Sequence, residues 1–143
     1  MIILPEIILS LGFLLLLCIS PFIKADSHKF IGYLGLLLIF LTQFSIVKDI
    51  FIFEEVFEGF FIIDSFGSFL KLIILISGGL VLFFYLIVKH DKSLNRPEFS
   101  LVVLISLIGM MFMVSANNLL SLFVSIELQS LALYILVSFS KED

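Results

Sequence analysis

The sequence predicts an all-α integral membrane protein with five transmembrane helices, forming a single membrane-embedded unit over residues 1–143 with no soluble domain. Apolar residues make up 62% of the chain, whereas a typical soluble domain is only about half apolar. The charged residues, 14% of the total, gather in short stretches between long apolar runs. Because a helix that crosses a bilayer needs about 20 mostly apolar residues, these runs are read as membrane spans.

The five apolar runs cover residues of about 2–23, 30–47, 66–88, 99–115 and 118–139. Each run approaches or exceeds the ~17 residues that a spanning helix requires. The first run has no basic segment before it and begins with Pro5 and Glu6, so we interpret it as a retained helix and not as a signal peptide. The single Cys18 lies in this run; it excludes a disulfide framework within the chain, and we expect it to serve packing only.

The basic residues predict the orientation in the membrane. If every run spans, six of the eight lysines and arginines fall on one side, namely Lys24, Lys29, Lys89, Lys92, Arg96 and Lys141. The positive-inside rule then places the amino terminus outside and the carboxyl terminus inside. Lys48 and Lys71 are expected near the opposite face, with the Lys71 side chain extending from the edge of the third helix to the interface.

The linker over residues 48–65 favours a short β-hairpin. Two runs rich in Phe and Ile flank Glu58 and Gly59, and Gly59 can supply the positive φ that a tight hairpin turn needs. The alternative is an amphipathic surface helix with Glu54, Glu55 and Glu58 on one side.

The fourth and fifth runs are joined by a very short turn, from Ser115 to Asn118. Asn is common both at the end and at the start of a helix. The two helices are therefore predicted to be an antiparallel pair in contact, with Gly109 serving their packing.

Glu127 is the only charged residue in the fifth run and falls near its midpoint. A charged side chain at the centre of a bilayer costs at least ~2.5 kcal/mol, and such residues commonly mark ion or proton pathways. We therefore expect Glu127 to take part in proton transfer or charge coupling with a cationic partner. The structural alternative is a permanently protonated acid that bonds to a neighbouring helix.

Polar side chains near Glu127 are candidates for its support. Ser130 and Tyr134 share a helix face with Glu127, so their hydroxyls could donate hydrogen bonds or hold a water. For these two residues and for Gln129, interhelical bonding is the favoured interpretation. Lys141 lies nearly four turns further along the same helix, so the cationic partner is expected from another chain.

The block from residue 97 to residue 139 carries a specific pattern of small, polar and leucine positions around Glu127. Its members are Ser115, Asn117, Leu119, Leu122, Glu127, Leu128, Ser130, Leu131, Leu133, Tyr134 and Leu136. This block resembles the antiporter-like proton-pumping subunits of respiratory complex I, above all NADH dehydrogenase subunit 2, or chain N. The segments Leu4–Leu9 and Phe57–Lys71 resemble the same subunit.

The resemblance implies a fold of two inverted five-helix repeats and pairs the helix-five glutamate, here Glu127, with a lysine on helix seven. This chain ends inside the first repeat, which predicts the amino-terminal piece of a split subunit, with a laboratory truncation as the alternative. The implied function is a share in proton translocation coupled to electron transfer from NADH to ubiquinone, with no complete active site in this chain. The implied partners are a companion chain that carries the lysine, other membrane-arm subunits and lipids.

No cofactor or metal site is expected in the chain itself, because it has one cysteine and no glycine-rich phosphate loop. NADH, FMN, iron–sulfur clusters and ubiquinone would be held by other subunits, and nothing is basic enough to suggest nucleic acid. A composition typical of AT-rich genomes favours the mitochondrial inner membrane, with the amino terminus on the intermembrane side, over a bacterial plasma membrane. The rival functions are a subunit of a cation/proton antiporter complex and a non-catalytic membrane scaffold.

Overall fold

The structure is a computed structural model that describes residues 4–22, 28–48, 50–51, 53–56, 58–87 and 97–140. Within these ranges it contains the helices α1 (Leu4–Ile19), α2 (His28–Lys48), α3 (Ser65–Ile87), α4 (Pro97–Ser115) and α5 (Leu119–Ser140), with a 3₁₀ turn, η1 (Ser20–Phe22), after α1. All five helices are long and apolar enough to cross a membrane. The predicted fold class and the five spans are therefore confirmed. Lys24, Lys89, Lys92, Arg96 and Lys141, on which the predicted orientation largely depends, lie outside the described residues.

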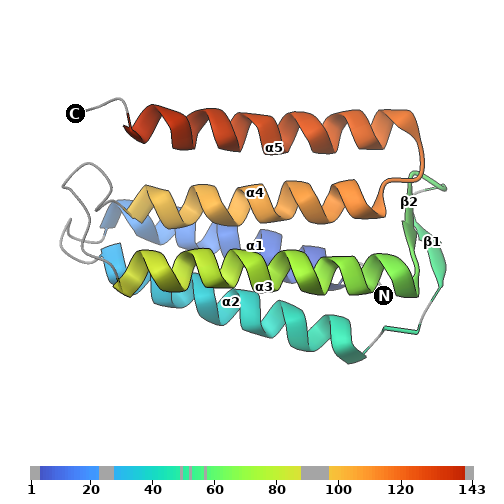
Figure 1. Cartoon of the computed structure of the whole chain (residues 1–143), viewed down its shortest axis with the longest axis horizontal. Coiled ribbons are helices and arrows are strands. Elements are labelled where there is room, and N and C mark those ends of the chain that lie inside the picture. The colour runs from blue at the N-terminus through green and yellow to red at the C-terminus, as the bar shows by residue number, and fades with distance from the viewer. Residues whose placement is uncertain are drawn as a thin grey trace.

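The helices run up and down in alternation (Figure 1). The start of α1, the linker between α2 and α3, and the turn between α4 and α5 meet at one end of the bundle, which we call the hairpin end. The carboxyl-terminal end of α5 lies at the other end. The side chains near the start of α1 and α3 therefore lie close to the end of α4.

The helix boundaries follow from local chemistry. Asp64 caps α3, because its Oδ1 accepts a hydrogen bond of 2.7 Å from the Gly67 amide. Asn118 caps α5 in the same way, with its Oδ1 2.9 Å from the Ser121 amide nitrogen. Pro97 occupies the first position of α4, where its missing N–H costs nothing.

Helix α4 is the centre of the bundle and contacts the other four helices. Of its membrane-spanning window, 61% is buried, against 17% for α5. The hydrophobic core gathers around it, with Leu75 and Leu82 from α3 meeting Leu104, Leu107 and Met111 from α4. Helix α5 packs chiefly on α4, and Figure 1 shows it at the margin of the bundle. Most of the surface of α5 is therefore left uncovered by the described residues.

The outer surface of the bundle is apolar. Large side chains such as Phe40, Phe44, Phe83 and Phe123 are exposed there, as expected for faces that meet lipid or further helices. Cys18 is also exposed, on the outer side of α1 and not in the core.

The linker forms the predicted hairpin and not the amphipathic helix. Strands β1 (Glu54–Val56) and β2 (Phe61–Ile63) pair antiparallel, with Glu55 opposite Ile62. Gly59 at the turn has a φ of 87°, as predicted, and Glu58 before it also has a positive φ, of 56°. Two successive residues with positive φ are the mark of the tight turns that suit the twist of paired strands.

Gly109 sets how closely α4 and α5 approach, because a β-carbon there would lie 3.1 Å from the Gln129 backbone nitrogen. Backbone cannot move aside as a side chain does, so we expect Gly109→Ala to lower the free energy of unfolding by about 1–3 kcal/mol relative to its control. The control is Gly79→Ala, where the new methyl would meet Ile39 Cγ2 at an ordinary 3.7 Å. Thermal unfolding in lipid nanodiscs, followed by helical circular dichroism, makes the comparison. Equal stability of the two variants would contradict this account.

Candidate functional site

A buried ion pair lies near the hairpin end of the bundle, between Glu6 on α1 and Lys71 on α3. Each residue is only 3% exposed. The expectation that Lys71 reaches the interface from the membrane edge is therefore wrong. The physical reason is its place on α3: Lys71 shares the inward face with Leu75 and Gly78, one and two turns further on. The Glu6 carboxylate then supplies the counter-charge that an inward ammonium requires.

Three helices contribute to this site. Lys71 Nζ donates to Glu6 Oε1, and the hydroxyl of Ser115, the last residue of α4, donates to the same oxygen at 3.4 Å. The second carboxylate oxygen, Glu6 Oε2, is buried and accepts no hydrogen bond from the described residues. In the sequence Glu6 is only an acid at the start of an apolar run, because its partner is 65 residues away. Only the tertiary fold brings the pair together.

Glu127 lies on α5 and faces away from the core of the bundle. It is the ninth residue of α5, about 12 Å along the helix from its first residue. Its side chain is on the exposed face, between the exposed Phe123 and Leu131. Among the described residues Glu127 forms no ion pair and no side-chain hydrogen bond. The expectation of a cation from another chain stays a prediction, and the outward direction of Glu127 is the geometry that it needs.

The two candidate supporting residues are placed differently. Tyr134 is 69% exposed on the same outer face as Glu127, and Ser130 is half-buried at the margin of that face. Gln129 lies next to Gly109 at the contact with α4, so its backbone takes part in helix packing. The structure places Glu127 and Tyr134 on one face of α5. A role for the hydroxyl of Tyr134 or of Ser130 in supporting Glu127 stays a prediction.

The hairpin holds the turn from which α5 starts. Phe61 on β2 forms a bridge with Ala116, and the Phe60 carbonyl accepts from the Asn117 amide at 2.9 Å and from the Ser121 hydroxyl at 2.8 Å. The Asn117 side chain also donates to the Gly59 carbonyl at 2.9 Å. The hairpin therefore fixes the entry of α5 and, with it, the position of Glu127.

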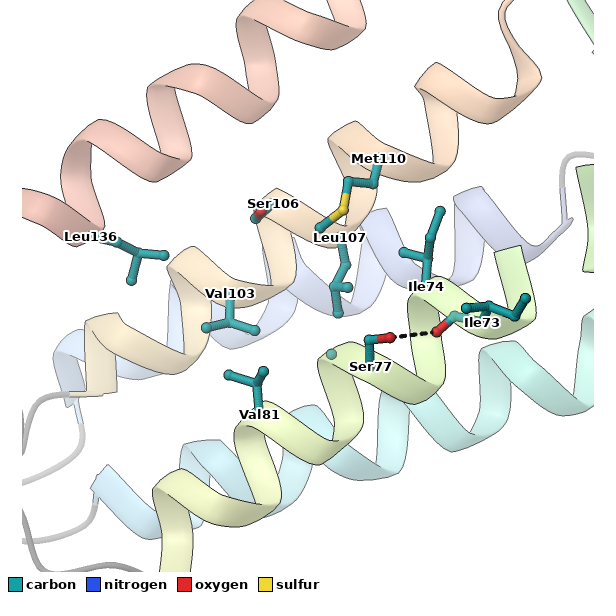
Figure 2. A pocket seen from close by; sticks show the side chains of 10 residues that line it. Ile73, Ile74, Ser77, Val81, Val103, Ser106, Leu107, Met110 and Leu136 are labelled. Atoms are coloured by element: carbon teal, nitrogen blue, oxygen red, sulfur yellow. Dashed lines mark hydrogen bonds between the residues drawn. The ribbon is translucent and has the colours of Figure 1, made fainter. Parts of the chain in front are cut away.

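A separate cavity of about 270 Å³ lies between α3, α4 and α5 (Figure 2). Its walls are apolar, with Val81, Val103 and Leu136 among them, apart from the hydroxyls of Ser77 and Ser106. The Ser77 hydroxyl donates to the Ile73 carbonyl at 2.9 Å, as the dashed line shows. With no charged residue in its lining, this cavity suits an acyl chain or an apolar side chain and not a proton-transfer site.

Comparison with curated proteins shows similarity over nearly the whole chain to proteins named NADH-quinone oxidoreductase subunit N. The relative from Parvibaculum lavamentivorans is 33% identical over 140 residues, which cover 98% of this chain and 29% of the relative. The relatives from Bartonella bacilliformis and Rhodospirillum rubrum are 36% and 35% identical, and the match again covers 29% of each. No family model matches the chain. The resemblance seen in the sequence is thus confirmed, and the chain spans less than a third of the length of these relatives.

Removing one member of the buried ion pair should lower the stability of the protein more than removing both members does. Lys71→Met leaves the Glu6 carboxylate buried without its cation, and we expect it to lower the free energy of unfolding by about 3–5 kcal/mol. The double variant Glu6→Gln/Lys71→Met removes both charges and should recover most of that loss. Thermal unfolding in lipid nanodiscs tests this. A double variant no more stable than Lys71→Met would show that the two charges do not depend on each other.

Proposed function

Since the chain is related over nearly its whole length to NADH-quinone oxidoreductase subunit N, we propose that it forms part of the membrane arm of respiratory complex I. In this role it contributes Glu127 to proton translocation, which is coupled to electron transfer from NADH to a quinone in other subunits. The observation that carries the proposal is the place of Glu127: mid-helix, on the uncovered face of α5.

The energetics of Glu127 require a partner. A carboxylate exposed to lipid near the centre of a bilayer costs about 2.5–3.5 kcal/mol on the most lenient scale. Further helices that cover the outer face of α5 would exclude lipid and supply a cation; the resemblance to the antiporter-like subunits supports a lysine in that role. Those helices belong to a companion chain of a split subunit or to a longer polypeptide. Tyr134 lies on the same outer face, where its hydroxyl could donate to the carboxylate or hold a water.

The proposed mechanism is electrostatic. When Glu127 is ionised it holds a proton on the partner lysine, and when Glu127 is neutralised that proton is released more readily. Moving one charge across the membrane involves ~2.3 kcal/mol per 100 mV, so the pair must alternate between states of different proton affinity. The electron-transfer reactions elsewhere in the complex would drive that alternation.

The proposed location is the mitochondrial inner membrane, with the hairpin end of the bundle and the amino terminus on the intermembrane side. The composition of the chain and the distribution of its basic residues support this placement. The three relatives named above are from bacteria, so the bacterial plasma membrane is the alternative.

Glu127→Gln should separate proton translocation from assembly. Gln has nearly the same size but cannot ionise, so we expect the complex to assemble while proton translocation falls by at least about tenfold, since a positioned proton-transfer group contributes about 10²–10⁴-fold. The readout is proton uptake into proteoliposomes per NADH oxidised.

The matched control is Glu98→Gln, the same chemical change at an exposed acid in the first turn of α4, at the end of the bundle away from the hairpin. It should behave as the unmodified protein does. Full proton translocation by the assembled Glu127→Gln complex would reduce Glu127 to a structural role and favour the scaffold function.

Mass spectrometry of the intact complex purified from native membranes tests the assembly itself. We expect the 16.2 kDa chain, or a longer polypeptide that contains it, beside redox subunits of complex I. A separate 16.2 kDa species beside a chain with the remaining helices would establish the split subunit. Its isolation with membrane partners but without redox subunits would replace the proposal with a cation/proton antiporter.

A further inference from the structure

The ion pair of Glu6 and Lys71 is a second charged site inside the membrane-spanning bundle, and the proposed role of Glu127 does not use it. Lys71 is the seventh residue of α3, about 9 Å along the helix from its first residue. Glu127 is about 12 Å along α5, which starts from the same end of the bundle. Glu6 is the third residue of α1 and contacts Ser115, the last residue of α4, so its carboxylate lies nearer the hairpin end than Glu127 does.

Stability alone is a poor reason to keep such a pair. Removing two charges from water costs several kcal/mol per ion, and a well-packed apolar pair of similar volume is often as stable or more so. Ionisable residues within membrane spans instead tend to mark proton or ion pathways. The burial of Glu6 and Lys71, each 3% exposed, therefore indicates that their charges have a function.

The hydrogen bonding of Glu6 is incomplete in a specific way. Oε1 receives both donors, the Lys71 ammonium and the Ser115 hydroxyl, while Oε2 is buried and accepts no bond from the described residues. An orphaned carboxylate oxygen in an apolar interior is unfavourable unless a proton or a water occupies it. Oε2 is the position at which the carboxylate can take up a proton without losing either existing contact.

The described elements packed around the site bring few other titratable groups to it. Asp64, just before α3, is engaged as the cap that accepts from Gly67. The helices supply Lys71 from α3 and Ser115 from α4, and among the described residues Lys71 is the cation that pairs with Glu6. The hairpin closes this end of the bundle, where Phe61 packs on Phe112 with ring centroids 5.6 Å apart.

We propose that Glu6 is a proton-binding residue, and that Glu6, Lys71 and Ser115 form a second proton site of the bundle at its hairpin end. A proton from water binds at Oε2 and converts the carboxylate to the acid, so the net charge of the pair changes from zero to +1. Lys71 stays an ammonium throughout, and release of the proton reverses the step. Lys71 and Ser115 are positioning residues that hold Oε1, so that Oε2 is the oxygen that binds the proton.

The inference rests on the proposed function, and its test uses the whole complex from native membranes. Glu6→Gln/Lys71→Met removes both charges together and nearly keeps the volume, so the complex should still assemble. Proton translocation per NADH oxidised should fall severalfold. A double variant that translocates protons at the unmodified ratio would overturn the proposal and leave the pair as a structural link.

Infrared difference spectroscopy provides a second readout that does not depend on the double variant folding. Turnover should change the band of a protonated carboxylic acid, and Ser115→Ala, which keeps both charges, should shift that band because the Glu6 acid loses a hydrogen-bond donor. An unshifted band would contradict a proton on Glu6. The control is Ser77→Ala, whose hydroxyl bonds the Ile73 carbonyl in the apolar cavity away from Glu6 and should leave the band unchanged.

Comparison with Glu127→Gln separates failure of this inference from failure of the proposed function. Loss of translocation in Glu127→Gln but not in the double variant would reject the role of Glu6 alone. Full translocation in both would reject the proposed function and the inference built on it.

Discussion

Charge pairing in an apolar medium is the constraint on which this structure depends. The chain places two carboxylates in largely apolar helices, Glu6 near the hairpin end of the bundle and Glu127 near the middle of α5. Glu6 faces inward and is neutralised by Lys71 within the chain, whereas Glu127 faces outward with no cation among the described residues. An unpaired charge is costly in both the protein interior and the bilayer. The charge of Glu6 is therefore neutralised within the chain, whereas we propose that Glu127 takes its cation from a partner.

Helix α4 holds the elements that carry the two carboxylates in place. Its burial against all four other helices lets Ser115 reach Glu6 at one end, while its close approach at Gly109 holds α5. The hairpin adds a second hold on α5 through its hydrogen bonds to Asn117 and Ser121. These contacts fix the position of α5 although most of its surface is exposed in the described structure. A helix that presents Glu127 to a partner needs both the fixed position and the exposed face.

Further helices packed on α5 would account both for its exposed apolar face and for the exposed Glu127. Phe123, Leu131 and Tyr134 surround Glu127 on the face of α5 that the described part of the chain leaves exposed. The curated relatives are more than three times as long as the matched segment. Further helices packed on this face would bury the aromatic rings and desolvate the carboxylate together, and desolvation strengthens every electrostatic interaction that the carboxylate makes.

The sequence by itself determined the features that depend on residues close together along the chain. Apolar run lengths predicted five spans, Glu58 and Gly59 predicted the hairpin, and the short turn after Ser115 predicted the pairing of α4 with α5. The tertiary structure alone decided which helix faces point inward. Helices that are apolar nearly all round carry little periodic information about their buried side. The position of Lys71 was therefore wrongly predicted at the interface, and its partner, 65 residues away, could be identified only once α1 and α3 were packed together.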